Sequence, residues 1–137
     1  MKIFYGMLSA AAMLCLVAMP VAQADEPIPI RVLLDSATAH NTHTVTIGGI
    51  IRDMKAFPPF VTKLCSAVYG SYVLTLEDDS GSISVEVFGV CGASGGSIQV
   101  SNGPRVLVIG QFLLRSSRSE NVPIIYTNAS LVTQVSN

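Results

Sequence analysis

Two alternating runs on either side of a short polar turn constrain the fold of this chain more than any other feature. In residues 71–77 apolar side chains recur at every second position, and the same period of two returns over residues 82–88. Asp78-Asp79-Ser80-Gly81 separates the two runs. A period of two is typical of a strand with one buried face, and a glycine-containing turn favours antiparallel pairing. The pattern therefore predicts a β-hairpin over residues 71–88.

Further strands are expected at residues 44–51, 105–114 and 123–131. The paired glycines Gly48-Gly49 predict a bulge or sharp bend in the first strand. Residues 60–69 are expected to form one or two helical turns within a long first connection, and no amphipathic helix of ordinary length is visible. Five short strands favour a small closed barrel over a β-sandwich, which generally has about seven strands. We therefore predict an all-β, five-stranded barrel with little helix.

The first 24 residues are typical of a cleaved signal peptide. Lys2 precedes the mostly apolar residues 8–21, and Ala22-Gln23-Ala24 matches the pattern that signal peptidase recognises. The alternative, a retained membrane anchor, is disfavoured because the run is short and contains Pro20. We expect a periplasmic or secreted protein without stable membrane insertion after cleavage. Without Lys2, seven Lys and Arg residues face nine Asp and Glu residues, so the charge of residues 25–137 is −2.

Only two cysteines, Cys65 and Cys91, lie outside the predicted signal peptide. In an oxidising compartment they are expected to form one disulfide, the alternative being two separate buried thiols. Extending the hairpin ladder outward brings Cys91 toward Tyr69, which is four residues from Cys65. A disulfide needs Cα atoms within about 7 Å, and this register makes that distance reachable.

The order of several motifs resembles that of OB-fold domains. These motifs are Val45-x-Ile47-x-Gly49, the stretch from Tyr72 to Ile83 that contains LEDDSGSI, Val87-Phe88, and Gly103-x-x-Val106-x-Val108-x-Gly110. They are most similar to the nucleic-acid-binding type found in anticodon-binding domains and helicase accessory modules. The resemblance covers about residues 43–132 and implies a Greek-key barrel there. Residues 25–42 are then an N-terminal extension and residues 133–137 a C-terminal tail.

The chain also resembles small periplasmic bacterial OB-fold proteins and, more distantly, secreted toxin B-subunits. The first resemblance implies single-stranded nucleic acid or an oligonucleotide as the partner. The others imply an envelope or stress-related protein that binds a protein, a small ligand or a glycan. The acidic balance of the chain opposes phosphate binding, because proteins that grip phosphates non-specifically are usually basic.

In OB-folds the ligand usually lies on the outside of the second and third strands, between two loops. The side chains expected on that face are Val73, Thr75, Glu77, Ser82, Ser84, Glu86 and Phe88, opposite the core residues Leu74, Leu76, Ile83, Val85 and Val87. Stacking aromatics and cations are what a single strand needs there. The candidate ligand-binding residues are Phe88, Thr75 and Ser84 on the face, Phe60 and Tyr69 on the first connection, and Arg115 and Arg118 in the loop before the last strand. In the alternative interpretation, Phe60 plugs the barrel and the arginines are solvated.

Catalytic chemistry is not indicated by the sequence. His40 and His43 lie in a polar loop without the three or four converging ligands that a metal needs. Asp78 and Asp79 are interpreted as turn residues that bond their own backbone, rather than as an acid–base pair. No nucleophile elbow, phosphate loop or HExxH motif is present. We therefore expect a non-enzymatic binding module with no catalytic residue, metal or cofactor.

Overall fold

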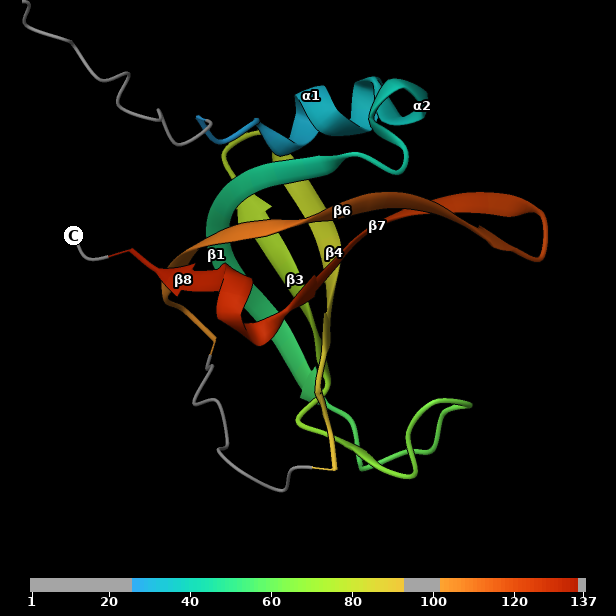
Figure 1. Cartoon of the computed structure of the whole chain (residues 1–137). Helices are drawn as coiled ribbons and strands as arrows, with labels where there is room; N and C mark the ends of the chain where they lie inside the picture. Colours follow the sequence, from blue (N-terminus) through green and yellow to red (C-terminus); the bar gives the residue numbers. More distant parts are fainter. Residues whose placement is uncertain (1–25, 93–101, 136–137) are drawn as a thin grey trace, which may run out of the picture.

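The computed structural model describes residues 26–92 and 102–135, and it consists mainly of β-strands with little helix (Figure 1). The prediction of an all-β chain is confirmed in this respect. The predicted signal peptide and most of the Gly/Ser-rich segment after Cys91 lie outside the described residues. The strands are β1 (Thr44–Ala56), β2 (Val68–Tyr69), β3 (Tyr72–Asp78), β4 (Gly81–Phe88), β5 (Val90–Cys91), β6 (Arg105–Ser117), β7 (Glu120–Asn128) and β8 (Val132–Gln134). The helices are α1 (Ile30–Asp35), α2 (Ala37–His40) and a 3-10 turn (Ala129–Leu131).

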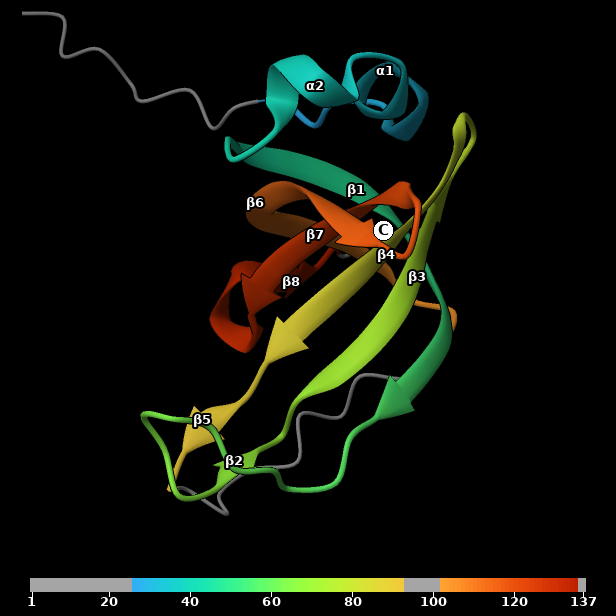
Figure 2. The same ribbon diagram turned by 90° about the vertical axis from the view of Figure 1, so that its right-hand side faces the viewer.

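Six strands form one sheet in the order β1-β3-β4-β7-β6-β8, and β1 also pairs with β6 (Figure 2). Only the β4–β7 pair within this sheet is parallel. The short strand β8 pairs with residues 106–108 of β6, so part of the predicted C-terminal tail belongs to the sheet. Strands β2 and β5 form a separate small ladder below β3 and β4.

The hairpin predicted from the alternating pattern is β3–β4. Its register runs from Tyr72 opposite Val87 to Asp78 opposite Gly81. The five side chains expected to face the core are at most 4% exposed, whereas those between them are half-buried or exposed. Periodicity alone therefore assigned the two faces of this hairpin correctly.

Strand β1 is long and curved, because it pairs with β6 through its first half and with β3 through its second. Gly49 sits where β1 changes partner, and a Cβ atom there would lie 2.5 Å from the carbonyl oxygen of Glu77. Close backbone approach thus explains this glycine. The predicted bulge lies further along the strand, where the register shifts between Arg52 and Lys55 and Asp53 has a φ of 48°.

Strand β6 is longer than predicted, and β7 begins and ends three residues earlier than predicted, so that the two strands meet in a tight turn. Strand β6 continues to Ser117 and β7 begins at Glu120, so residues 115–117 are strand rather than turn. Pro123 therefore lies inside β7 instead of beginning it. It is tolerated because β7 pairs only with β6 at that point, and the parallel ladder with β4 begins at Ile124.

Helix α1 closes one end of the sheet structure. Its side chains Ile30 and Leu33 are fully buried in the same core as Phe112, the largest fully buried side chain. Figure 1 shows α1 and α2 together at the end of the molecule opposite β2 and β5. The N-terminal segment predicted as an extension thus supplies core residues. Phe60, considered as a plug, is 37% exposed.

Asp78 joins helix α1 to the β3–β4 turn. Its Oδ2 accepts a hydrogen bond from the backbone N–H of Ile30 at 2.9 Å. Its Oδ1 accepts from the backbone N–H groups of Ser80 and Gly81 and from the Ser80 hydroxyl, at 2.6–3.0 Å. Desolvation acts to raise the pKa of Asp78, but the hydrogen bonds from Ser80, Ile30 and Gly81 together outweigh it and hold that pKa below its ordinary value.

We expect Asp78→Asn to lower the free energy of unfolding at pH 7 by about 1 kcal/mol, because hydrogen bonds to a charged carboxylate are replaced by weaker ones to an amide. A carboxyl group with a lowered pKa in the folded state stabilises the fold above its unfolded pKa of about 3.9. That contribution disappears as the pH falls through the folded pKa. Urea unfolding of both proteins between pH 7 and pH 2 should therefore show the difference shrinking below about pH 4. A difference that stays constant over this range would contradict the assigned role.

Candidate functional site

The outer surface of β3, β4 and β7 carries a row of three aromatic side chains. The Phe88 ring, at the end of β4, lies 6.3 Å from the Phe60 ring in an edge-on arrangement and 6.1 Å from the Tyr126 ring in a tilted one. Phe60 comes from the β1–β3 connection and Tyr126 from β7. Phe88 is 36% exposed and Phe60 is 37% exposed. We call Phe60, Phe88 and Tyr126 the aromatic row.

Tyr126 was not among the predicted site residues. Tyr126 lies between the buried residues Ile125 and Thr127 of β7. Because neighbouring side chains of a strand point to opposite faces, the Tyr126 side chain points outward. Its neighbour across the ladder is Glu86, and that pairing exists because β4 and β7 run parallel. Burial acts first to raise the pKa of Tyr126, and the Glu86 carboxylate adds to the effect, so the phenol stays neutral.

Thr75 and Ser84 lie directly opposite each other in the β3–β4 ladder, and both are half-buried. Ser84 is also paired with Ile124 of β7. Their small polar side chains lie on the same face of the sheet as Glu86 and Phe88.

Arg115 lies in strand β6, so its prediction as a loop residue is wrong. Its guanidinium donates two hydrogen bonds to the Glu86 carboxylate, at 2.6 Å and 2.9 Å. Because β7 lies between β4 and β6, this ion pair spans β7. The hydrogen bond with Glu86 raises the pKa of Arg115. Arg115 thus neutralises a carboxylate on this face and is not available as an unpaired cation.

The other two predicted residues differ in position: Arg118 lies at a hairpin tip, whereas the backbone of Tyr69 packs against Gly89, next to Phe88. Arg118 is exposed at the tip of the β6–β7 hairpin with a φ of 51°, and Figure 1 shows that tip extending away from β2 and β5. Tyr69 is half-buried in β2, opposite Val90 of β5. The structure therefore brings Phe60, Phe88, Thr75 and Ser84 to one surface and leaves Arg118 at a distance from it.

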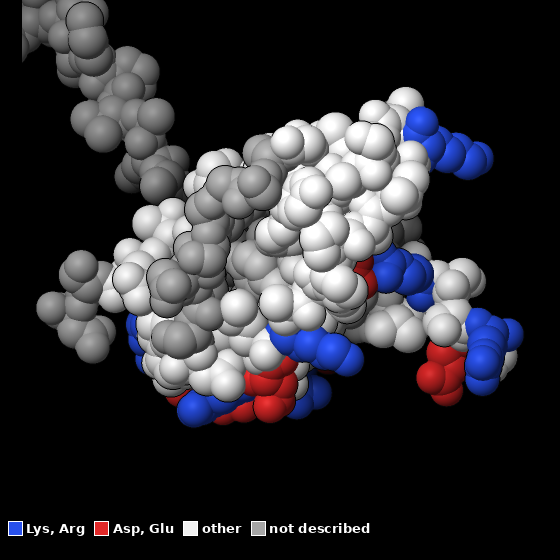
Figure 3. All heavy atoms as spheres, turned by 90° about the horizontal axis from the view of Figure 1, so that it is seen from below, with Lys and Arg blue, Asp and Glu red and all other residues white. Residues whose placement is uncertain are grey.

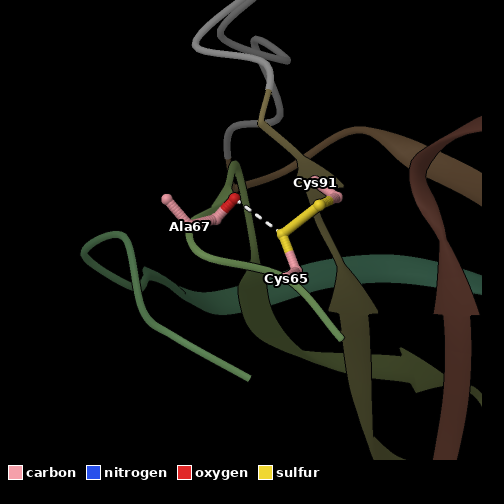
Figure 4. The surroundings of a disulfide bond; sticks show 3 residues. All are labelled: Cys65, Ala67 and Cys91. Carbon is pink, nitrogen blue, oxygen red and sulfur yellow. Dashed lines mark hydrogen bonds between the residues drawn. A yellow bond between two sulfur atoms is a disulfide. The ribbon is translucent and has the colours of Figure 1, made fainter. Parts of the chain in front are cut away.

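The predicted disulfide between Cys65 and Cys91 is confirmed (Figure 4). The two Cα atoms are 5.8 Å apart, and the carbonyl oxygen of Ala67 lies 3.0 Å from the Cys65 sulfur. The segment expected to be helical is instead a β-ladder, in which Phe60 bridges to Val68 and β2 pairs with β5. The disulfide holds this ladder, and with it Phe60, against the end of β4.

Other chemistry-bearing groups do not converge. Within residues 26–92 and 102–135, no three His, Cys, Asp or Glu side chains are placed to hold a metal ion. His43 hydrogen-bonds the carbonyl of Asn41 through its Nδ1 and is exposed. The Tyr72 hydroxyl is buried in the core without a hydrogen-bond partner in the described part of the chain, and burial raises its pKa.

No protein-family model matches this chain, and no curated protein is significantly similar to it. In the described part of the chain, none of the helices has the length and apolar character needed to cross a membrane.

Proposed function

We propose that the chain is an OB-fold barrel that acts as a non-enzymatic binding module. The strand pairings support this proposal, because β1, β3, β4, β7 and β6 each pair with two of the others and β6 returns to β1. The antiparallel hairpins and the single parallel β4–β7 pair suit a five-stranded Greek-key barrel. The motifs that resemble OB-fold domains fall on these same strands.

The ligand face in this proposal is the outer surface of β3, β4 and β7, and the ligand is a single-stranded oligonucleotide. The aromatic row carries the proposal. Exposed aromatic rings that follow one another along a sheet are stacking sites for successive bases, whatever the base sequence. The Thr75–Ser84 pair lies on the same face as Phe88 and offers hydroxyl groups to a bound base.

A second candidate ligand is an uncharged one, such as a glycan, a small molecule or a protein segment. The Arg115–Glu86 ion pair favours it, because the charge of Arg115 on this face is already neutralised by a carboxylate. Oligonucleotide binding should weaken steeply with added salt, whereas binding of an uncharged glycan should hardly change. We also propose that the protein is periplasmic or secreted, which fits the predicted signal peptide and the disulfide.

We expect Phe88→Ala to weaken binding of a fluorescein-labelled oligothymidylate by about 1–3 kcal/mol, the contribution of one base–aromatic stack. Fluorescence polarisation over a salt series measures both the affinity and the salt slope. Arg118→Ala should reduce that slope by about one phosphate contact if the strand reaches the hairpin tip. Phe57→Ala is the matched control, because Phe57 is 42% exposed on the same connection but is not in the aromatic row.

Equal affinities of wild type, Phe88→Ala and Phe57→Ala for the oligonucleotide would contradict the proposed face. Absence of oligonucleotide binding together with binding on a glycan array, lost in Phe88→Ala, would replace the nucleic-acid ligand with the second candidate and keep the face.

A further inference from the structure

The β1–β3 connection contains a tight turn, before β2, whose tip is exposed and mainly apolar. Leu64 is 98% exposed and Val61 is 76% exposed, and Lys63, next to Leu64, is also exposed. Val90 of β5, across the disulfide from this turn, is 58% exposed. We call Val61, Lys63, Leu64 and Val90 the turn surface. Scattered exposed apolar residues are ordinary, but a leucine this exposed on a constrained turn is not accounted for by packing.

The turn is held in place by bonds on both sides of its tip. Thr62 and Cys65 exchange two backbone hydrogen bonds, at 2.9 Å and 3.4 Å, so Lys63 and Leu64 are the two tip residues. Cys65 is buried and joined to Cys91, and Val90 directly precedes Cys91 in β5. The disulfide thus fixes the tip relative to the small β2–β5 ladder, and Leu64 is presented outward without a partner element in the described residues.

The chain segments at this end of the molecule carry more positive than negative charge. Residues 54–76 contain two lysines, Lys55 and Lys63, and no carboxylate, and residues 87–92 contain no charged side chain. The nearest carboxylates along the chain are those of Asp53 and Glu77, which flank the stretch. Figure 3 views the molecule from this end and shows a broad area without charged side chains, with Lys, Arg, Asp and Glu side chains gathered at its edges. The chain as a whole is acidic, so this local excess of cations is a departure from its average.

We propose that the turn surface docks on an anionic phospholipid bilayer, with Leu64 and Val61 entering the acyl region and Lys63 lying among the headgroups. Two observations select a bilayer over a protein partner. The tip is a protruding two-residue turn, whereas a stable protein interface needs about 800 Å² on each partner. Its lysine adjoins its most exposed apolar side chain, which is the arrangement that suits a negatively charged membrane surface.

The expected attachment is weak and reversible. Three apolar side chains and one lysine contribute no more than a single acyl anchor, which alone gives only marginal binding. Such an attachment leaves Phe88 and Tyr126 uncovered, because they lie on β4 and β7 rather than at the tip, and only Phe60 of the aromatic row adjoins the turn surface. The inference therefore does not depend on the oligonucleotide proposal.

The test is co-sedimentation of the secreted protein, its N-terminus checked by intact mass, with vesicles of phosphatidylglycerol and phosphatidylcholine. We expect binding to these vesicles and not to vesicles of phosphatidylcholine alone. Leu64→Gln should lower the partition coefficient about tenfold, since it removes the main inserted side chain. Lys63→Gln should lower it about fivefold, the contribution of one lysine near an anionic leaflet. Val122→Gln is the matched control, because Val122 is 41% exposed on the β6–β7 hairpin and lies outside the turn surface.

No binding of the wild-type protein to anionic vesicles would overturn the proposal. An equal loss of binding in Leu64→Gln and Val122→Gln would also overturn it, because the contact would then not depend on the turn surface. If light scattering shows a dimer that Leu64→Gln converts to a monomer, without vesicle binding, the turn surface is a self-association site instead. Circular dichroism of each variant checks that the fold is retained.

Discussion

Replacing Phe112 with alanine should lower the free energy of unfolding by about 3–5 kcal/mol, the usual cost of removing a large aromatic side chain from a core. Phe112 is fully buried and is the largest of the fully buried side chains. It lies on β6 opposite Ile125 of β7. Its backbone carbonyl accepts a hydrogen bond from residue 42 and its N–H donates one to the carbonyl of residue 43, just before β1 begins. The strands around its ring are therefore held in place by backbone hydrogen bonds. The cavity left by the substitution could for this reason close only in part.

Urea unfolding followed by circular dichroism measures this effect. Phe57→Ala is the control, since it removes the same side chain from a position that is 42% exposed, and we expect it to cost less than about 1 kcal/mol. Similar losses in both variants would mean that Phe112 does not occupy the core described here.

Removing the disulfide by the double substitution Cys65→Ser and Cys91→Ser should lower the free energy of unfolding by about 3 kcal/mol. The cross-link joins residues 26 positions apart, and its main effect in the chain-entropy model is to restrict the unfolded chain. The substitution should also loosen the β2–β5 ladder that positions Phe60. We therefore expect weaker binding of any ligand of the aromatic row, beyond the loss of stability.

Adding a reductant tests the stabilising effect of the disulfide. Dithiothreitol should destabilise the wild-type protein to the level of the double variant and leave the double variant unchanged. Unfolding curves that are identical with and without reductant, for a protein whose thiols are shown by mass analysis to be reduced, would contradict the stabilising role.

Local patterns predicted those parts of the fold that depend on neighbours in the chain. The alternation through residues 71–88 was sufficient for the β3–β4 hairpin and for the direction of each of its side chains. The hairpin register, extended outward, was sufficient for the disulfide to within one residue, because Cys91 pairs with Val68 of β2 rather than with Tyr69, three residues from Cys65. In both cases the relevant partners are fewer than 30 positions apart, and the turn fixes their register.

The missed features depend on pairings between distant segments. Tyr126 and the Arg115–Glu86 ion pair belong to the candidate site only because β7 lies parallel to β4, and no local pattern specifies a parallel neighbour. The role of α1 was missed for a related reason. A helix of six residues is too short for its apolar periodicity to be recognised in a sequence. It is stabilised by tertiary contacts, because Ile30 and Leu33 are buried in the core and the Asp78 carboxylate accepts the N–H of Ile30.

The pairing scheme has a consequence for the rate at which the protein folds. The β3–β4 and β6–β7 hairpins join near neighbours and can form early, but β4–β7 joins Ser84 to Ile124 and β1–β6 joins Thr44 to Gln111. These long-range ladders must close large loops before any of their contacts stabilise the chain, and topologies of this kind fold in milliseconds to seconds. Until they close, the edges of both hairpins are open to other chains. A secreted chain with this topology would therefore depend on rapid closure, or on chaperones, to avoid aggregation while its last ladders form.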